Sequence, residues 1–419
     1  MDFWIINHYA VPPEFYSGTR HFDLAKGLIE NYNSKVLIFT SNFSHFSFKY
    51  FIEIDNNLSF KYIKKSYEGV YFLFFNVPSY KGNNIFRFFN MLFFSLSIYL
   101  NSLKISKEEF APDVIIGSSV HPFAALSAYF IAKRLRKMYK KDIKFVFEER
   151  DLWPQYLYHF LEKTKNPFKK IILIIFFKIL YLIQQFLYKN SDKLIFLQKK
   201  GIENAKKYQN KSLLLFQIYR KINYNLDGYI DQEFEGIRKK YRYLFCFAGG
   251  ITVISYAIKE IVLAFKYLDK NKFGFVIFGG GDYLEEILKT IEENNIQNVF
   301  YLGFKRKELI RNYYLKKADF LVIPCSFEIK IDFSSNKLID YLEQRKPIIV
   351  VGYNLLDILN EIGFIIEDKD PQTIAYKLVE IVNIDSEVIK DKVNKGYEYL
   401  VNELDYRVAA KRLYEFIKS

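Results

Sequence analysis

The sequence predicts an α/β protein made of two doubly wound domains, each with a parallel sheet that lies between helices. Short apolar runs alternate with longer helical patterns along almost the whole chain, which is typical of parallel βαβ units. A polar stretch at residues 220–240 interrupts this alternation, which then restarts. With 419 residues, the chain is too long for one ordinary core and fits two domains of roughly 150–200 residues.

In the first half, apolar runs mark the strands, and longer helical patterns lie between them. The expected strands are residues 3–7, 35–40, 71–75, 113–116, 144–147 and 193–197. The expected helices include residues 20–31, 122–138 and 168–188. The stretch at residues 41–80 is harder to assign, and we interpret it as a loop-rich insertion.

The second half repeats the same alternation. Its expected strands are residues 243–248, 274–278, 299–302, 320–323 and 347–351. The closing helix, residues 407–418, has no strand after it and is expected to pack back across the domain junction. We therefore predict an N-terminal domain of residues 1–212, with residues 404–419 packing back on it. A C-terminal domain of residues 213–403 is expected to face it across a cleft.

The composition narrows the class of protein. The formal charge of +14 and the pI of about 9.2 would suit nucleic acid or an anionic membrane surface. No Arg-rich tract, zinc spacing or stacking motif supports nucleic-acid binding. Cys246 and Cys325 lie inside apolar runs, so buried thiols in a reducing cytoplasm are expected rather than a disulfide. The first residues resemble a strand rather than a signal peptide, and no uncharged apolar run reaches ~20 residues.

The most informative stretch is residues 145–154, where a short apolar strand runs into Glu149, Arg150 and Asp151 and stops at a Trp-Pro break. Charges at the carboxyl end of a buried strand are costly to desolvate. They lie beside the crevice in which open α/β sheets bind ligands. We therefore interpret Arg150 and Asp151 as catalytic candidates. The alternative is that Arg150 and Asp151 form an ion pair that only holds a loop in place.

Two other strand ends in the first half carry candidates for the acceptor side of the site. Gly18 precedes a predicted helix that opens with Arg20 and His21, and a glycine there lets the backbone approach a ligand. His121 follows the strand at residues 113–116 and a short run of small hydroxyl residues. His121 could contact an acceptor, or it could act as a helix cap.

Glycine turns follow the first two strands of the second half. Gly249 and Gly250 end the first, and Gly280 lies in the turn after the second. Neither turn has the GxGxxG pattern followed by an acid about 20 residues later, so a nicotinamide-dinucleotide site is disfavoured. Flexible glycine turns that face one cleft still suit a nucleotide diphosphate.

A loop entering a helix provides the remaining donor-side candidates. Free N–H groups at Ser334, Ser335 and Asn336 would cradle a diphosphate, and Lys337 would add a full positive charge. Asp340 lies one to two turns into the helix, where a carboxylate can accept two ribose hydroxyls. A capping serine beside a solvated lysine is the alternative.

Two apolar segments are candidates for membrane contact, residues 85–100 and 163–188. Lys163, Lys165, Lys169 and Lys170 cluster at the start of the second segment, where they could meet anionic headgroups. A helix buried in the domain is the competing interpretation for residues 171–188.

Four ordered blocks, at residues 8–21, 112–122, 149–154 and 336–348, resemble the family 4 glycosyltransferases of the GT-B fold. The similarity is closest to bacterial sugar transferases of O-antigen and capsule assembly, and it covers nearly the whole chain. It implies retaining transfer from a nucleotide-diphosphate sugar without a metal ion or other cofactor. The C-terminal domain would hold the nucleotide, and the N-terminal domain would present the acceptor.

The resemblance also implies roles for single residues. The family's paired acids, eight positions apart, fall on Asp332, which would hold the donor sugar, and on Asp340, which would hold the ribose. Arg150 and Asp151 fall where many relatives have a His-Asp pair near the transferred sugar.

The sequence departs from the family pattern at three places. Both paired acids are Asp rather than the usual Glu, and the usual Asn-Gly is missing around Gln217. The Arg and Lys that neutralise the diphosphate in many relatives fall on Ile251 and Tyr256. Lys337 is the best substitute for them, with Lys259 a weaker one.

We therefore predict a bacterial hexosyl- or N-acetylhexosaminyltransferase that is cytoplasmic and peripheral on the inner face of the cell membrane. Its donor would be a UDP-sugar, and its acceptor a lipid-linked or growing surface polysaccharide. The first alternative is a non-catalytic scaffold of a glycan-assembly complex, which the missing Arg/Lys pair supports. The second is a two-domain nucleotide-sugar epimerase, which would need no acceptor.

Overall fold

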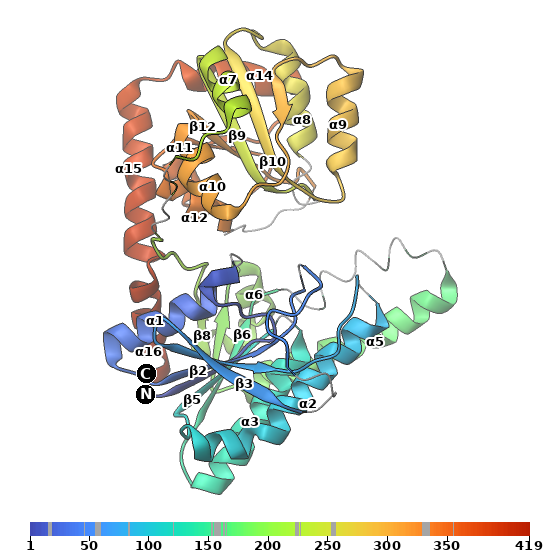
Figure 1. The fold of residues 1–419 in the computed structure, drawn as a ribbon, viewed down its shortest axis with the longest axis vertical. Coiled ribbons are helices and arrows are strands. Elements are labelled where there is room, and N and C mark those ends of the chain that lie inside the picture. Colours follow the sequence, from blue (N-terminus) through green and yellow to red (C-terminus); the bar gives the residue numbers. More distant parts are fainter. Residues whose placement is uncertain are drawn as a thin grey trace. The chain divides into compact units, whose positions relative to one another are not determined.

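The computed structural model describes residues 1–15, 19–45, 47–54, 60–82, 84–119, 121–151, 154, 161, 164, 166–222, 226, 228–252, 257–328, 336–354 and 356–419. The chain divides into two compact units (Figure 1). Unit 1 contains Met1–Ile218 together with Tyr406–Ser419, and unit 2 contains Tyr219–Asp405. Unit 1 extends past the predicted boundary at residue 212, because residues 212–214 form a strand of its sheet.

Unit 1 is built on an eight-stranded sheet in the order β3-β4-β2-β1-β5-β6-β7-β8. Its strands are β1 (Phe3–Ile6), β2 (Val36–Ser41), β3 (Tyr62–Tyr67), β4 (Val70–Phe75), β5 (Val114–Ser118), β6 (Lys144–Glu149), β7 (Lys193–Phe196) and β8 (Ser212–Leu214). Its helices are η1 (Pro13–Phe15), α1 (Arg20–Tyr32), α2 (Ile85–Glu108), α3 (Pro122–Tyr139), α5 (Pro167–Asn190), α6 (Lys199–Asn204), η3 (Lys206–Lys211) and α16 (Tyr406–Lys418).

The two faces of this sheet pack against different helices, as alternate strand residues dictate. In β1, Phe3 and Ile5 point into a core completed by α1 and α16. Trp4 and Ile6 point into a second core, completed by α2, α3 and α5. The inner strands β1, β2 and β5 are buried on both faces, which explains why they appear as continuous apolar runs in the sequence.

The sequence missed β3, which pairs antiparallel with β4 at the edge of the sheet. Lys64 and Lys65 are exposed on it, so the strand lacks an apolar run. Charged side chains are common on edge strands, where they discourage pairing with another chain. Part of the stretch at residues 41–80, expected to be loop-rich, is therefore a β-hairpin.

Unit 2 has a six-stranded parallel sheet in the order β11-β10-β9-β12-β13-β14. Its strands are β9 (Tyr243–Gly250), β10 (Phe273–Gly280), β11 (Val299–Tyr301), β12 (Phe320–Pro324), β13 (Ile348–Val351) and β14 (Gly363–Ile366). Its helices are α7 (Gln232–Lys240), α8 (Ala257–Ala264), η5 (Phe265–Tyr267), α9 (Leu284–Glu293), α10 (Lys307–Leu309), η6 (Ile310–Tyr314), α11 (Leu315–Lys317), α12 (Asn336–Glu343), α13 (Leu359–Ile362), α14 (Pro371–Val382) and α15 (Ser386–Glu403). The five predicted strands correspond to β9–β13, and β14 was not predicted.

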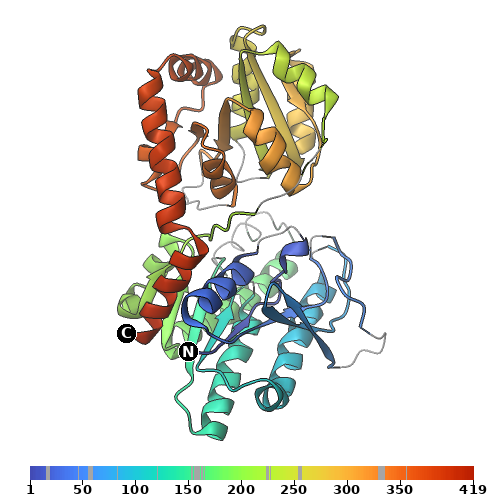
Figure 2. The same cartoon turned by 60° about the vertical axis from the view of Figure 1, so that its left-hand side comes forward.

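Helix α16 lies along α1 in unit 1, although unit 2 separates the two in the sequence (Figure 2). Gly27 of α1 permits this close approach. A β-carbon at residue 27 would lie 2.5 Å from the carbonyl oxygen of Tyr406 and 2.7 Å from Cβ of Ala410. The rings of Tyr32 and Tyr414 stack at 3.8 Å beside this contact. The end of the described chain is thus part of the core of unit 1.

Helices α2 and α5 are long and apolar enough to cross a membrane, judged by length and composition alone. In their most apolar windows, 44% and 28% of the residues are buried in the protein. Large apolar side chains are exposed on α5, including Phe168, Ile172 and Leu182. For most of its length, α5 is therefore not the buried helix that was the competing interpretation.

Candidate functional site

In unit 2, the two neighbouring strands β9 and β10 both end in glycines. Gly249 pairs with Gly279, and Gly250 with Gly280, in the last register positions of the two strands. A β-carbon at Gly279 would lie 2.0 Å from the carbonyl oxygen of Gly249, so only glycine fits there. A β-carbon at Gly280 would contact nothing within 4 Å. The carboxyl end of this sheet thus presents bare backbone, which a ligand can approach closely.

Lys337, the second residue of α12, extends its side chain over this glycine turn. Its Nζ lies 4.5 Å from the centre of the Phe247 ring, and a β-carbon at Gly249 would lie 2.9 Å from Nζ. Burial lowers the pKa of Lys337 to about 8. Within the described ranges, no carboxylate pairs with Lys337. A desolvated cation beside bare backbone is suited to an anionic ligand.

Asp340 lies one turn further along α12, between two cations of the same unit. Its Oδ1 is 3.4 Å from Nε of Arg311 and 3.7 Å from Nζ of Lys307. Burial raises the pKa of Asp340, while Lys307 and Arg311 act in the opposite direction. Arg311 also binds Glu343, so the guanidinium is fixed by two carboxylates. The carboxylate that was predicted to hold a ribose is therefore tightly oriented.

Lys259, the weaker candidate for the diphosphate cation, is engaged elsewhere. Its Nζ lies 2.5 Å from Oε1 of Glu286 on α9. This hydrogen bond is the main reason why the pKa of Lys259 is raised. Because Lys259 is held by Glu286, Lys337 is the better candidate for the cation that binds the diphosphate.

Four of the predicted site residues fall outside the described residues: Gly18, Asp332, Ser334 and Ser335. Their predicted roles stay predictions. Tyr256 lies outside them as well, whereas Ile251 is fully buried in the core of unit 2.

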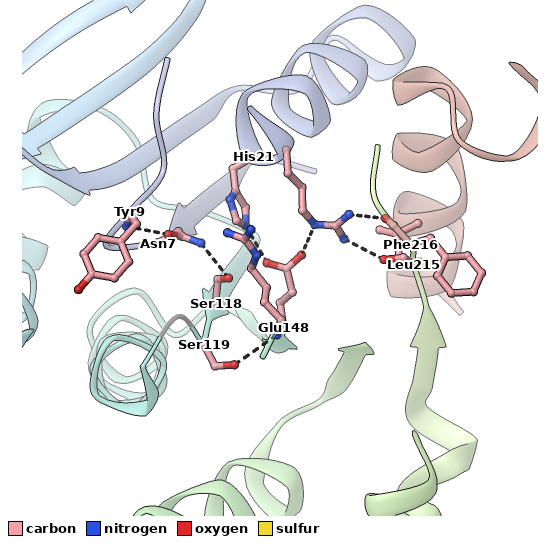
Figure 3. A network of polar contacts seen from close by, with 10 residues as sticks. Asn7, Tyr9, His21, Ser118, Ser119, Glu148, Leu215 and Phe216 are labelled. Carbon is pink, nitrogen blue, oxygen red and sulfur yellow. Dashed lines mark hydrogen bonds and ion pairs between the residues drawn. The ribbon is translucent and has the colours of Figure 1, made fainter. Parts of the chain in front are cut away.

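In unit 1, Glu148 at the carboxyl end of β6 is the centre of a buried polar network (Figure 3). Its Oε1 accepts a hydrogen bond from Nε of Arg20 at 2.9 Å, and its Oε2 lies 2.7 Å from Nε2 of His21. Burial alone would raise the pKa of Glu148, but His21 and Arg20 hold it well below its usual range. Burial lowers the pKa of His21. Neutral His21 therefore donates to an ionised Glu148.

Arg20 also ties this network to the strand-end segment that leads out of unit 1. Its guanidinium donates to the carbonyl oxygens of Leu215 and Phe216 (Figure 3). Arg20 and His21 were predicted to face the acceptor, but the structure places both in the interior, bound to Glu148. Their contribution there is to hold the end of β6, which carries Arg150 and Asp151.

Glu149, the next residue, points to the other side of β6 and binds α5. It accepts hydrogen bonds from Nε2 of Gln184 and, at 2.7 Å, from the hydroxyl of Tyr188. Burial raises the pKa of Glu149 to about 8, so the carboxyl group is mostly protonated at pH 7. Glu149 therefore fixes α5 to the sheet.

Arg150 and Asp151 follow at the end of the strand. The backbone N–H of Arg150 donates to Oγ of Ser119 at 3.3 Å. Nε of Arg150 is buried and has no hydrogen-bond partner in the described part of the chain. Burial raises the pKa of Asp151, which Arg150 and Arg87 oppose. The structure thus brings both catalytic candidates to the same edge as His121 without assigning them a ligand.

His121 pairs with His8, which follows β1. Nε2 of His121 lies 2.7 Å from Nδ1 of His8, and both rings are buried. Burial lowers the pKa of His121 to about 3 and that of His8 well below its usual value, so both rings are neutral. His121 is the N-cap residue of α3, but its side chain caps no backbone N–H. Nδ1 of His121 is buried without a partner among the described residues.

A cluster of three aromatic rings and one arginine adjoins this histidine pair. Its members are Tyr9, His45, Tyr80 and Arg87. The rings of Tyr9 and His45 stack at 5.4 Å, and Nδ1 of His45 lies 2.8 Å from the hydroxyl of Tyr80. The guanidinium of Arg87 lies 5.9 Å from the centre of the Tyr9 ring. The sequence analysis did not find these four residues as a site, because three of them lie in stretches with no clear period.

Comparisons with known proteins agree with this architecture. Residues 242–383 match the family model described as Glycosyl transferases group 1. Three solved structures are similar over essentially the whole length of both chains. The first is Anabaena HepE in complex with UDP and glucose, with 10% identity, coverage of 100% of both chains and a TM-score of 0.64. The second is a glycosyltransferase from Rickettsia africae, with 13% identity, coverage of 100% of this chain and 98% of the other, and a TM-score of 0.61. The third is an Escherichia coli trehalose-6-phosphate structure bound with UDP-2-fluoro glucose, with 10% identity, coverage of 100% of this chain and 99% of the other, and a TM-score of 0.66. No curated protein matches the sequence.

The protein has the GT-B fold. This confirms the predicted fold class, and within the GT-B fold, unit 2 carries the segment that matches the group 1 glycosyl transferases. The narrower likeness to family 4, and to O-antigen and capsule enzymes, stays a prediction.

The sequence analysis of this GT-B protein found Lys337 and Asp340 but missed their neighbours. Lys307 and Arg311 fix Asp340, and the basic run at residues 305–307 was the only signal in the sequence that could have pointed to them. Arg311 lies in the π-helix η6 and carries no pattern of its own.

Proposed function

We propose that the protein is a retaining glycosyltransferase that moves a sugar from a nucleotide-diphosphate sugar, a UDP-sugar in the first instance, without a metal ion. The observation that supports this best is the position of Lys337, a desolvated cation above the glycine turn of β9. The family match covers this region of unit 2. The similar HepE structures contain UDP or UDP-glucose, which favours UDP as the nucleotide to test first.

In the proposed reaction, the bond between the sugar's anomeric carbon and the leaving phosphate oxygen breaks. The acceptor oxygen forms its bond to the same carbon on the same face. The leaving phosphate takes the acceptor's proton and keeps the bonding electron pair. Lys337 stabilises the charge that develops on the diphosphate, and the N-terminal end of α12 adds the favourable helix dipole.

The residues of unit 1 would orient the acceptor. Arg150 and Asp151 lie at the carboxyl end of β6, and His121 lies beside them at the start of α3. His121 is neutral, so its ring can donate or accept one hydrogen bond to a sugar hydroxyl. The acceptor in this proposal is a lipid-linked or growing surface glycan, which the enzyme reaches from the cytoplasmic face of the membrane through α2 and α5.

The test is the thermal stability of the whole protein with UDP, GDP, ADP and NAD in the presence of EDTA. A ligand at 100 times its dissociation constant adds about 2.7 kcal/mol of stability. A shift with UDP that Lys337→Ala abolishes and Lys259→Ala retains is the expected result. With an active donor, Lys337→Ala should lower turnover roughly 10²-fold. Unchanged turnover would remove Lys337 from the proposed role.

A non-catalytic scaffold of a glycan-assembly complex is the second candidate. It is favoured by Ile251, which replaces a cation of many relatives and is fully buried in the core. This candidate predicts that no nucleotide shifts the melting temperature and that Asp340→Ala is tolerated in cells. The transferase proposal predicts the opposite in both experiments.

A further inference from the structure

Lys307 is a second lysine beside the candidate nucleotide site of unit 2. It is the first residue of α10, and its Nζ lies 3.7 Å from Oδ1 of Asp340 on the neighbouring helix α12 (Figure 1). Asp340 is the only carboxylate within 4 Å of this Nζ in the described part of the chain. The side chain of Lys307 is 31% exposed, whereas that of Arg311, the other cation at Asp340, is 5% exposed. Lys307 is therefore the cation of the two that a ligand from solvent can reach.

The ammonium group of Lys307 is held less closely than the other cations of the basic run at residues 305–307. Lys305 and Arg306 each have a side-chain nitrogen 3.1 Å from a carboxylate oxygen. The 3.7 Å between Lys307 and Asp340 is longer than an ordinary hydrogen bond. A lysine ammonium also has three N–H donors on a flexible stem. Lys307 can therefore donate hydrogen bonds to a ligand and stay beside Asp340.

The loop that leads to Lys307 is joined to the glycine turn of the site. Gly303 lies in this loop, and its carbonyl oxygen accepts a hydrogen bond from the backbone N–H of Gly279 at 3.0 Å. Gly279 pairs in turn with Gly249, over which the side chain of Lys337 extends. Backbone hydrogen bonds thus fix the start of α10 at the same edge of the sheet as the bare backbone and the buried lysine.

The charges at this edge leave Lys307 as the partner of Lys337. Asp340 follows Lys337 by three positions on α12, so the two side chains occupy neighbouring parts of one helix surface. Arg311 is taken up by Glu343, to which it donates from Nε at 2.9 Å and also from Nη2. Lys337 supplies one positive charge, whereas a diphosphate carries more than one negative charge. Among the described residues of the site, Lys307 is the cation that can supply the second.

We propose that Lys307 is a second phosphate-binding residue, which contacts the phosphate next to the ribose while Lys337 contacts the outer phosphate. The proposal rests on the proposed function, since it requires a nucleoside diphosphate in unit 2. Asp340 is the predicted partner of the ribose hydroxyls, and Lys307 borders Asp340. The phosphate on that ribose is therefore the one within reach of Lys307. Lys337 lies one turn nearer the N-terminal end of α12, where the outer phosphate gains the helix dipole.

The test compares the affinities of the full chain for uridine, UMP and UDP by equilibrium titration. Lys307→Met keeps most of the length of the side chain and removes its charge. UMP and UDP should each bind about tenfold or more weakly to this variant, because a hydrogen bond between charged groups is lost. Uridine should bind as it does to the wild type, and Lys307→Arg should restore most of the UMP affinity. Lys316→Met, at an exposed lysine of α11, is the matched control and should leave all three affinities unchanged.

The uridine affinity separates a phosphate contact from a structural role. If Lys307→Met weakens uridine as much as UMP, Lys307 acts only by orienting Asp340 and the proposal is wrong. Unchanged UMP and UDP affinities in Lys307→Met would also overturn it. Asp340→Asn is the complementary variant and should weaken all three ligands, because each contains the ribose. The proposed function is tested separately by Lys337→Ala, which should weaken UDP more than UMP, and a wild type that binds no nucleotide would overturn both proposals.

Discussion

The side chain of Lys337 crosses the backbone of Gly249 so closely that a β-carbon at residue 249 would lie 2.7 Å from the lysine Cε. The position of the cation thus depends on a glycine 88 positions away in the sequence. Gly249 also has a φ of +157° and is the last residue but one of β9. The place of the Lys337 side chain therefore depends on the absence of a side chain at Gly249.

Gly249→Ala should displace Lys337 and weaken UDP binding even though alanine is a small residue. The measurement is the UDP-induced thermal shift, which should fall to the level of Lys337→Ala. Gly236→Ala is the control, since a β-carbon there meets nothing within 4 Å and residue 236 lies within α7. That variant should keep the shift and gain about 0.4–1 kcal/mol of stability. A normal UDP shift in Gly249→Ala would show that the contact is unimportant for binding.

UDP affinity should depend on pH through Lys337. Burial lowers the pKa of Lys337 to about 8, so the free protein loses this charge as the pH rises through 8. A bound diphosphate favours the ammonium form, and affinity should therefore fall by up to about tenfold between pH 7.5 and pH 9. Calorimetric titration across this range measures the effect. The profile of Lys337→Ala should be flat, and a wild-type profile that is equally flat would contradict the assignment.

Substitution by glutamine should destabilise the protein much more at Glu148 than at its neighbour Glu149. Glu148 is ionised and paired with Arg20, so Glu148→Gln leaves a buried cation uncompensated and should cost about 3–5 kcal/mol. Glu149 is mostly protonated at pH 7, so Glu149→Gln replaces one neutral group by another and should cost less than about 1.5 kcal/mol. Urea denaturation at pH 7 measures both free energies of unfolding.

The pH dependence of Glu149→Gln checks the same assignment. Because the folded pKa of Glu149 is raised to about 8, its contribution to stability is present below the unfolded value near 4.5 and lost as the pH rises through 8. The wild type should therefore lose stability relative to Glu149→Gln between pH 5 and pH 8. Equal slopes for the two proteins would show that Glu149 is ionised in the folded state.

Membrane contact should depend on the exposed apolar residues of α5. Ile172 and Leu182 are 61% and 65% exposed, and Lys169 and Lys170 lie near the start of the helix. Ile172→Ser with Leu182→Ser should lower sedimentation with phosphatidylglycerol vesicles by at least about tenfold, since each buried side chain contributes roughly 1.5–3 kcal/mol. Tyr376→Ser with Val379→Ser, on α14, is the control with exposed apolar residues elsewhere. Equal sedimentation of both double variants would exclude α5 as the contact.

The fold was largely predictable because buried parallel strands leave a strong pattern. Runs such as the one that became β13 are apolar at every position and end at polar or glycine residues. The edge strand β3 has no such run, because its lysines face solvent. A strand that is only half buried leaves a pattern that resembles a loop.

The site was less predictable, because the sequence shows which residues carry charge but not which charges meet. Arg20 and His21 are drawn into the interior by Glu148, 128 and 127 positions away. The local spacing of residues in the sequence identifies neither the pairing of Arg20 with Glu148 nor that of His21 with Glu148. Lys337 was found because its position at the start of a helix, beside glycine turns, is a local pattern with a direct electrostatic meaning.

The packing of α16 on Gly27 has a consequence for how the protein is made. Unit 1 contains residues that the ribosome delivers both before and after all of Tyr219–Asp405. α1 ends at Tyr32 and α16 at Lys418, so at about 5–20 residues per second roughly 20–80 s pass before α16 can cover α1. During that interval its apolar side chains, Leu24 and Leu28 among them, are open to chaperones or to other nascent chains. Unit 2 is a contiguous segment and can complete its own core while unit 1 is still unfinished.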